Sequence, residues 1–252
     1  MTELFNSLLT QPLFNLLVFL YDIIPGENLA LAIITLTLMI KLVLYPLASQ
    51  SIKSQKALQE LQPKLNDLKK QYKNNREGLA KATMELYKTE RVNPLSSCLP
   101  LLIQLPFLIA VFHVFSYGLG HESLNQLYYF VPNPGELKTM SFGIDLSQPN
   151  IMLALLTGIA QYFQTKMLTH SRQPKVSGAK DEDMMAQMNK QMLYFMPVIT
   201  VFIGATLPSG LIVYWLTMTL LTILQQQLVF KVKKVSTANK LEVIDKPNEN
   251  IK

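Results

Sequence analysis

A single lysine, Lys41, lies near the centre of an otherwise apolar run of twenty residues, LALAIITLTLMIKLVLYPLA, from Leu29 to Ala48. A helix of that length covers about 30 Å, the hydrocarbon thickness of a bilayer. An ammonium there costs at least ~2.5–3.5 kcal/mol on insertion scales, so it is retained where it faces water, a partner or the protein interior. Lys41 therefore predicts a functional site inside the membrane. The alternative is a lysine that snorkels to the nearer interface, about 10 Å along the helix.

Polar side chains on the other apolar segments also recur at helical spacing. Thr37 and Tyr45 lie one turn before and one turn after Lys41, on the same stripe. Three further stripes contain Ser97 and Gln104; Thr157, Gln161, Gln164 and Thr165; and Trp215, Thr219, Thr222 and Gln226. A single Thr or Gln in a span most simply forms a hydrogen bond to a neighbouring helix, worth about 0.6 kcal/mol. No Asp or Glu lies within any span to pair with the cation, which predicts a hydrated cavity or groove.

Apolar and charged residues are segregated along the chain, although 49% of residues are hydrophobic and only 16% are charged overall. This pattern predicts an all-α polytopic membrane protein with five transmembrane helices around a hydrophilic groove. The predicted spans are 29–49, 94–116, 151–169, 192–207 and 211–230. Residues 1–28 lack the basic region and small-residue cleavage site of a signal peptide, and they predict an amphipathic helix on the membrane surface. A weak sixth span is the alternative for that segment.

Lys and Arg are concentrated in three segments outside the spans. Ten lie in residues 50–93, four in 170–191 and six in 231–252, whereas 117–150 contains one. The positive-inside rule therefore places the first three segments in the cytoplasm, the 117–150 loop and the N-terminus outside, and the C-terminus inside. The net charge of +6 thus belongs to cytoplasmic segments that can meet anionic lipid or RNA.

Two of the basic segments differ in whether regular structure is expected. Apolar residues recur at helical spacing in 51–72 and again in 77–88, with a polar break at Asn74 and Asn75. Residues 50–93 therefore predict a helical hairpin. The tail at 231–252 has too few apolar residues to fold alone and predicts a segment without regular structure.

Three function classes can be weighed from these features. A transporter or channel could use Lys41 to bind an anion, but the five spans form no evident two-fold repeat. An enzyme is not predicted, because the three histidines are scattered and no carboxylate pair, metal-ligand spacing, GxSxG, HExxH or P-loop pattern occurs. We accordingly expect no metal and no cofactor, and the lone Cys98 can form no intrachain disulfide. A protein that guides another apolar segment into lipid would use the groove, the basic hairpin and the apolar walls together.

Three stretches resemble the YidC/Oxa/Alb family of membrane insertases. They are MIKLVLYPLASQSIKSQKALQELQPKLNDLKKQYK, LYKTERVNPLSSCLPLLIQLPFLIAVFHVF and LPSGLIVYWLTMTLLTILQQ, and the similarity covers about residues 12–234. Two positions depart from the family pattern: the groove cation, commonly Arg, is Lys41, and the residue before Cys98, commonly Gly, is Ser97. Lysine keeps the charge but loses the bidentate fork of arginine. The resemblance leads us to expect a protein of the compact type found in Gram-positive bacteria, without the large extracytoplasmic domain of Gram-negative relatives.

The resemblance implies a multi-pass protein of the bacterial cell membrane that transfers hydrophobic segments of newly made membrane proteins from the cytoplasm into the bilayer, without nucleotide hydrolysis. The implied partners are nascent membrane proteins, membrane lipid, the ribosome through the basic cytoplasmic segments, and the Sec translocon. We expect the substrate groove to be lined by Lys41, Thr37, Gln104, Gln161, Gln164, Tyr214, Trp215 and Thr219. The alternative function is a small-solute or anion transporter or channel that uses the same intramembrane cation.

Overall fold

The computed structural model describes residues 2–72, 75–93, 99–117, 124–168 and 191–244. Most of them are helical. The helices are α1 (Thr2–Phe5), η1 (Asn6–Thr10, a π-helix), α2 (Gln11–Ile23), α3 (Leu29–Val43), α4 (Tyr45–Gln71), α5 (Arg76–Thr89), α6 (Leu99–Tyr117), α8 (Ile151–Leu168), η3 (Gln191–Phe195, a π-helix), α10 (Met196–Gly204) and α11 (Ser209–Ile244). The predicted cytoplasmic loop at 170–191, apart from its last residue, lies outside the described residues, as do Asn74, Ser97 and Cys98.

Several of these helices are apolar enough to lie in a bilayer. In the described part of the chain, two have the length and composition of a span by themselves, Glu3–Ile23 and Ser209–Lys231. Leu102–Phe115 and Leu193–Gly204 are shorter apolar helices. The predicted count of five spans and the surface position of residues 1–28 stay predictions, because length and composition alone do not distinguish a span from an interfacial helix.

The first predicted span is bent rather than straight. Helices α3 and α4 pass the test for a span only together, and they meet at an angle of 69°. The bend falls at Leu44, just before Pro46 in the first turn of α4, whereas the sequence predicted a span that continues to residue 49. Proline has no N–H to bond the preceding turn, and its ring displaces the carbonyl four residues earlier, so the ladder of α3 cannot continue through it.

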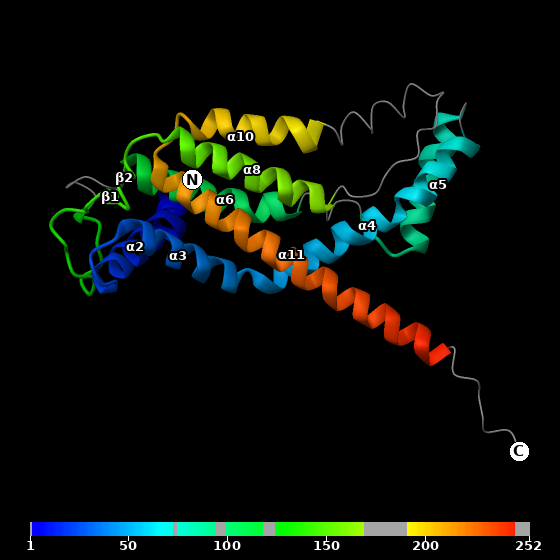
Figure 1. Ribbon diagram of the computed structural model, residues 1–252, viewed down its shortest axis with the longest axis horizontal. Coiled ribbons are helices and arrows are strands. Elements are labelled where there is room, and N and C mark those ends of the chain that lie inside the picture. The colour runs from blue at the N-terminus through cyan, green and yellow to red at the C-terminus, as the bar shows by residue number, and fades with distance from the viewer. Residues whose placement is uncertain (1, 73–74, 94–98, 118–123, 169–190, 245–252) are drawn as a thin grey trace, which may run out of the picture.

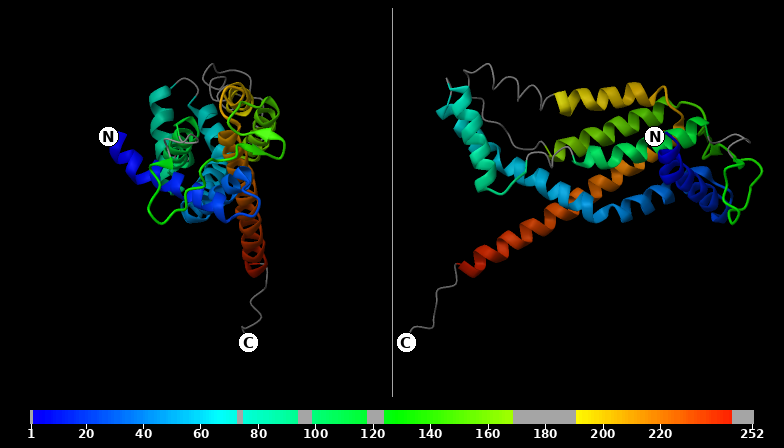
Figure 2. Two further views of the ribbon diagram at one scale, coloured as in Figure 1. Left: turned by 90° about the vertical axis from the view of Figure 1, so that its left-hand side faces the viewer. Right: turned by 180° about the vertical axis from the view of Figure 1, so that it is seen from behind.

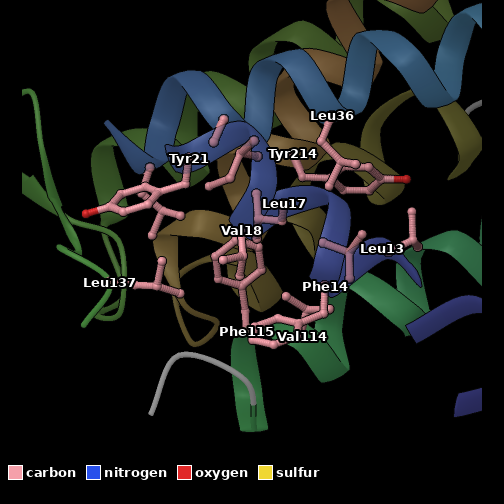
Figure 3. Packing of buried hydrophobic residues seen from close by; sticks show 14 of the residues in the cluster. Leu13, Phe14, Leu17, Val18, Tyr21, Leu36, Val114, Phe115, Leu137 and Tyr214 are labelled. Carbon is pink, nitrogen blue, oxygen red and sulfur yellow. The ribbon is translucent and has the colours of Figure 1, made fainter. Parts of the chain in front are cut away.

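The buried core joins the N-terminal helix to the bundle. Leu17 and Val18 of α2 are almost completely buried, and they lie between side chains of α3, α6 and α11. Figure 3 shows Tyr21 of α2 and Tyr214 of α11 within this cluster, with their hydroxyl groups pointing to opposite sides. Packing of this kind excludes lipid and water from one face of α2, while Phe19 and Ile23 remain exposed on the other.

The loop before α8 is fastened to α2. The buried Asn15 donates to the carbonyl of Gln126 at 3.3 Å and accepts from the backbone N–H of Tyr128 at 2.6 Å. The loop also contains a small antiparallel β-hairpin, β1 (Met140–Ser141) with β2 (Ile144–Asp145), which the sequence did not predict. Phe142 and Gly143, between the strands, have φ of 52° and 78°, the signs required at the two central residues of a type I′ turn.

Helix α11 is longer than its apolar part. The tail from residue 231 was predicted to lack regular structure, but the helix continues to Ile244, which corrects that prediction. No Gly or Pro occurs between Phe230 and Ile244. Adding residues to an existing helix avoids the cost of nucleation, so a polar sequence that would not fold alone can extend the span.

The two ends of the bundle differ. Figures 1 and 2 show α2 and the β1–β2 loop at one end, and α4, α5 and the far end of α11 directed toward the other. We call residues 45–89, which comprise α4 and α5, the α4–α5 arm. The arm contains most of the basic residues of the 50–93 segment. Basic segments that are distant in sequence are therefore gathered at the end opposite the 124–150 loop.

Candidate functional site

Lys41 is half-buried on α3, and its ammonium is directed to α11. Its Nζ donates to Oγ1 of Thr222 at 2.8 Å. Thr222 in turn donates to the carbonyl of Met218, one turn earlier in its own helix, at 2.7 Å. The cation thus meets a neutral hydroxyl that already uses its only hydrogen. Such a partner compensates part of the lost hydration but none of the charge, which leaves Lys41 able to attract an anion.

Gln104 and Tyr214 form a second polar contact between helices. The amide Nε2 of Gln104 on α6 donates to the hydroxyl of Tyr214 on α11 at 2.6 Å. Tyr214 is only 1% exposed, so its hydroxyl depends on this amide for a partner. The contact fixes α6 against α11 close to the core of Figure 3, where the Tyr214 hydroxyl points out of the apolar cluster.

Gln161 makes the third contact, on the other side of the bundle. The hydroxyl of Thr200 on α10 donates to its side-chain oxygen. Gln164 lies three residues further along the same face of α8 and is half-buried. Helix α8 packs against both α10 and α11. These two amides therefore belong to the α8–α10–α11 side of the bundle, and no described hydrogen bond joins them to Lys41.

The remaining predicted groove residues are placed differently. Thr37 is completely buried and donates to the carbonyl of Ile33 at 2.6 Å, so its hydroxyl is satisfied within α3. Thr219 is 4% exposed and bonds the carbonyl of Trp215 in the same way, at 2.8 Å. The Trp215 side chain is half-buried. Both threonines are buried and bond carbonyls of their own helices, and their contribution to a groove stays a prediction.

Three hydrogen-bonded pairs involve predicted groove residues, and α11 takes part in two of them. The structure joins two predicted residues to each other in the pair of Gln104 with Tyr214. It also adds partners that were not among the predicted groove residues: Thr222 for Lys41 and Thr200 for Gln161. Thr222 was visible as a member of the α11 stripe, but its pairing with Lys41 depends on how two distant helices pack. Thr200 carried a weaker signal, a lone hydroxyl within an apolar segment.

Two buried glutamines follow Thr222 on α11. Gln225 is 3% exposed and Gln226 is 1% exposed. Within the described part of the chain, the side-chain oxygen of each lacks a hydrogen-bond partner. A buried amide oxygen without a partner is costly, and water is the usual way in which such groups are satisfied. The segment of α11 beside Lys41 therefore has the polar character that a hydrated site requires.

A hollow lies within the α4–α5 arm. It has a volume of about 390 Å³ between α4 and α5. The residues that line it are Lys64, Asp67, Leu68, Gln71, Tyr72, Ala82, Glu85 and Leu86. Lys64 pairs with Glu90 at its rim. Burial in the arm raises the pKa of Tyr87 above its ordinary value of 10.0.

Among the described residues, no group of three His, Cys, Asp or Glu could hold a metal ion.

Charged groups at the opposite end stabilise the loop. Lys138 Nζ lies 2.5 Å from Oε2 of Glu27, and this hydrogen bond and charge raise the pKa of Lys138 above 10.5. The hydroxyl and backbone N–H of Ser147 both donate to Asp145, which lowers the pKa of that carboxyl below 3.8. Lys138 is exposed and Asp145 is half-buried on the surface of the loop, so these contacts order the loop and contribute little to global stability.

The apolar helices, the half-buried lysine between them and the polar contacts that join them define a membrane-integral helical protein. Comparisons with known proteins specify the class. The chain matches the family model described as 60Kd inner membrane protein over residues 19–237. The chain belongs to that family, which is the YidC/Oxa/Alb family of the sequence resemblance, and the predicted family is confirmed.

Individual relatives agree with this assignment. The chain is 32% identical over 225 residues to the membrane protein insertase YidC of Geobacter metallireducens, covering 89% of this chain and 37% of the relative. It is 35% identical over 207 residues to the membrane protein insertase YidC of Francisella tularensis subsp. novicida, covering 80% and 32%. The chain spans about a third of the length of these curated relatives.

A solved structure shares the fold. It is described as an active YidC insertase crystal structure with the first transmembrane domain resolved. The TM-score is 0.57 with 26% sequence identity, over 90% of this chain and 46% of that chain. Arrangement and sequence therefore lead to the same family.

Proposed function

We propose that this chain is a membrane protein insertase, which transfers apolar segments of newly made membrane proteins from the cytoplasm into the bilayer. The observation that carries the proposal is Lys41, an ammonium within an apolar span that has a hydroxyl as its partner at 2.8 Å. An ion pair would have neutralised that charge. A cation held by a neutral group keeps its field available for a passing carboxylate.

The proposed orientation places the N-terminus outside and the C-terminus in the cytoplasm, with five spans built on α3, α6, α8, α10 and α11. Its support is the clustering of basic segments. The α4–α5 arm and the extended end of α11 lie at one end of the bundle, opposite the 124–150 loop. Residues 50–93 contain ten basic and five acidic residues, a net charge of +5. Positively charged segments remain on the cytoplasmic side of a membrane.

The proposed mechanism lowers the barrier for a short polar segment to cross. That barrier is mostly desolvation, and a wet groove that reaches partway through the bilayer shortens the dry path. The orphan amide oxygens of Gln225 and Gln226 support water at this depth. Lys41 would attract acidic residues of the crossing segment, and the attraction is stronger at reduced dielectric than in bulk water.

The driving force in this proposal comes from the substrate. About twenty apolar residues that leave the groove for lipid are removed from water, which is strongly favourable, so nucleotide hydrolysis is not required. The outward faces of α6 and α11 suit such an exit, because residues such as Leu102, Leu220 and Leu224 are exposed and apolar. No bond of the substrate is made or broken, so the proposed activity is transfer rather than enzymatic chemistry.

Partners follow from the same surfaces. Nascent membrane proteins and lipid are the substrates and the medium of the proposed reaction. The ribosome would be held near the groove by the basic arm and the end of α11, through salt-sensitive contacts with rRNA phosphates. The Sec translocon is proposed as a partner for substrates with longer extracytoplasmic parts.

Site-specific photocrosslinking tests the proposal. A photoreactive lysine analogue at position 41 keeps the charge, and a photoreactive aromatic residue replaces Trp215. Both should crosslink to a small membrane protein during its synthesis, and more strongly than the same probes at Val43 and Phe163, which are 76% and 54% exposed on the outer faces of α3 and α8. Flux of a labelled anion through proteoliposomes, without crosslinks to the nascent chain, would instead support the transporter.

A further inference from the structure

Helix α11 bridges the bend between α3 and α4. On the α3 side, Lys41 donates to Thr222 at 2.8 Å. On the α4 side, one turn further along α11, the amide Nε2 of Gln225 donates to the backbone carbonyl of Tyr45 at 3.1 Å and to Oγ of Ser49 at 2.8 Å. The two contacts lie on either side of Leu44, where the 69° change of direction occurs.

The contact between α11 and α4 continues beyond the bend. The ammonium of Lys56 lies 4.6 Å from the centre of the Phe230 ring, a distance typical of a cation–π interaction. Ser51 and Ile52 of α4 are 0% and 3% exposed, so this part of the arm is packed against the bundle. Figure 1 shows α11 crossing the junction of α3 and α4 before it diverges from α4.

The bend needs such a bridge. Pro46 interrupts the ladder of backbone hydrogen bonds between α3 and α4, and the backbone bonds described at Leu44 are local ones: Leu44 N–H to the Ile40 carbonyl at 3.0 Å and Ala48 N–H to the Leu44 carbonyl at 2.9 Å. Rotation at a few such residues is how hinges change direction. Without a contact from another helix, the direction of the arm would be weakly determined.

Gln225 is suited to this task by its geometry. Its side chain is 3% exposed, and its NH₂ group contacts two acceptors of α4. Its oxygen is buried without a partner among the described residues. A side chain that served only to fill space would be cheaper without that unpaired oxygen, so the donor group is the part that the site uses.

We propose that Gln225 is a positioning residue that fixes the direction of the α4–α5 arm relative to the membrane-spanning bundle. The basic surface of the arm then keeps a constant angle to Lys41, which contacts α11 one turn before Gln225. This positioning role rests on the proposed function only in its expected effect on the insertion yield. The direction of the arm is a property of the fold and can be measured without any substrate.

Distances between two spin labels test the proposal. In a Cys98→Ser background, one label replaces Lys81, an exposed residue of α5, and the other replaces Ile159, an exposed residue of α8. Gln225→Ala should replace the single narrow distance peak of the parent protein in proteoliposomes with a broad or shifted distribution. Ser49→Ala removes one of the two acceptors on α4 and should give an intermediate broadening.

The matched control is Gln227→Ala, which removes an exposed glutamine two residues further along α11. It should leave the distance peak and the insertion yield unchanged, while Gln225→Ala lowers the yield. A distribution for Gln225→Ala as narrow as that for Gln227→Ala would overturn the proposal. If Gln225→Ala does not fold, an unchanged peak in Ser49→Ala would overturn it instead. A parent protein that shows the narrow peak but inserts no substrate would contradict the proposed function and leave the positioning role standing.

Discussion

Replacing Gly158 with alanine should separate two helices of the bundle. Gly158 lies on α8 where that helix packs against α10. A methyl group added there would overlap Cγ2 of Val201 and lie 3.1 Å from the backbone carbonyl oxygen of Pro197. Small residues at such positions allow close approach of helices in membranes, where packing rather than hydrophobic burial drives association.

The expected effect can be estimated from these contacts. Overpacking of a close interface costs about 1–3 kcal/mol, and Val201 is stiff because its β-branched side chain strongly prefers one rotamer in a helix. Alanine regains about 1 kcal/mol over glycine in helix propensity. Because the stiff Val201 places the overpacking cost at about 2–3 kcal/mol, the net destabilisation should be about 1–2 kcal/mol, which corresponds to a fall of roughly 2–8 °C in the unfolding midpoint of a chain of this size.

The assay is thermal unfolding in detergent for Gly158→Ala, Val201→Ala and the double variant. Val201→Ala removes the overlapping methyl group. The loss of unfolding free energy in the double variant should therefore be about 1 kcal/mol smaller than the sum of the losses in the two single variants. Additive effects, or a Gly158→Ala variant as stable as the parent, would refute the close contact between α8 and α10.

Three further outcomes follow from other contacts. Tyr214→Phe should destabilise the protein by about 1–3 kcal/mol, because it leaves the Gln104 amide without its partner, and Gln104→Leu in the same chain should recover part of the loss in thermal unfolding. Because the pKa of Lys138 is raised in the folded state, its pair with Glu27 stabilises the loop below pH 10.5 and is lost as the pH rises through the folded value; Glu27→Gln should abolish that alkaline step in loop proteolysis. Asn15→Ala should free the 124–150 loop from α2 and increase its rate of cleavage while the rest of the bundle stays protected. An unchanged cleavage rate would show that the loop is held by its apolar contacts alone.

Local pattern was sufficient to locate most helices and to single out Lys41 within an apolar helix. The two amphipathic stretches before and after Asn75 correspond to α4 and α5, and Asn75 itself begins the second helix by accepting the N–H of Gly78 at 2.8 Å. Lys41 could be recognised because its charge conflicts with its surroundings. These features depend on residues close in sequence, and such signals are local by nature.

Features that depend on packing between distant helices could not be read in the same way. Thr37 and Lys41 share a stripe, but Thr37 is completely buried while Lys41 contacts Thr222. This difference depends on which face of α3 packs against α11, and the periodicity of the sequence does not specify that face. The bend at Leu44 was signalled by Pro46, yet the continuous apolar run favoured a straight span. The helical extension to Ile244 depends on the preceding span rather than on its own composition.

The charge of Lys41 is tested most directly by insertion of two substrates that differ only in the acidic residues of a short extracytoplasmic tail. Lys41→Ala should lower insertion of the acidic-tailed substrate on the order of tenfold more than that of the neutral one, since about 1.4 kcal/mol of charge attraction corresponds to a factor of ten. Lys41→Arg should retain both, and Lys53→Ala, which removes a charge from the exposed surface of α4, should affect both equally. Equal insertion of the two substrates by Lys41→Ala would contradict electrostatic capture by this residue.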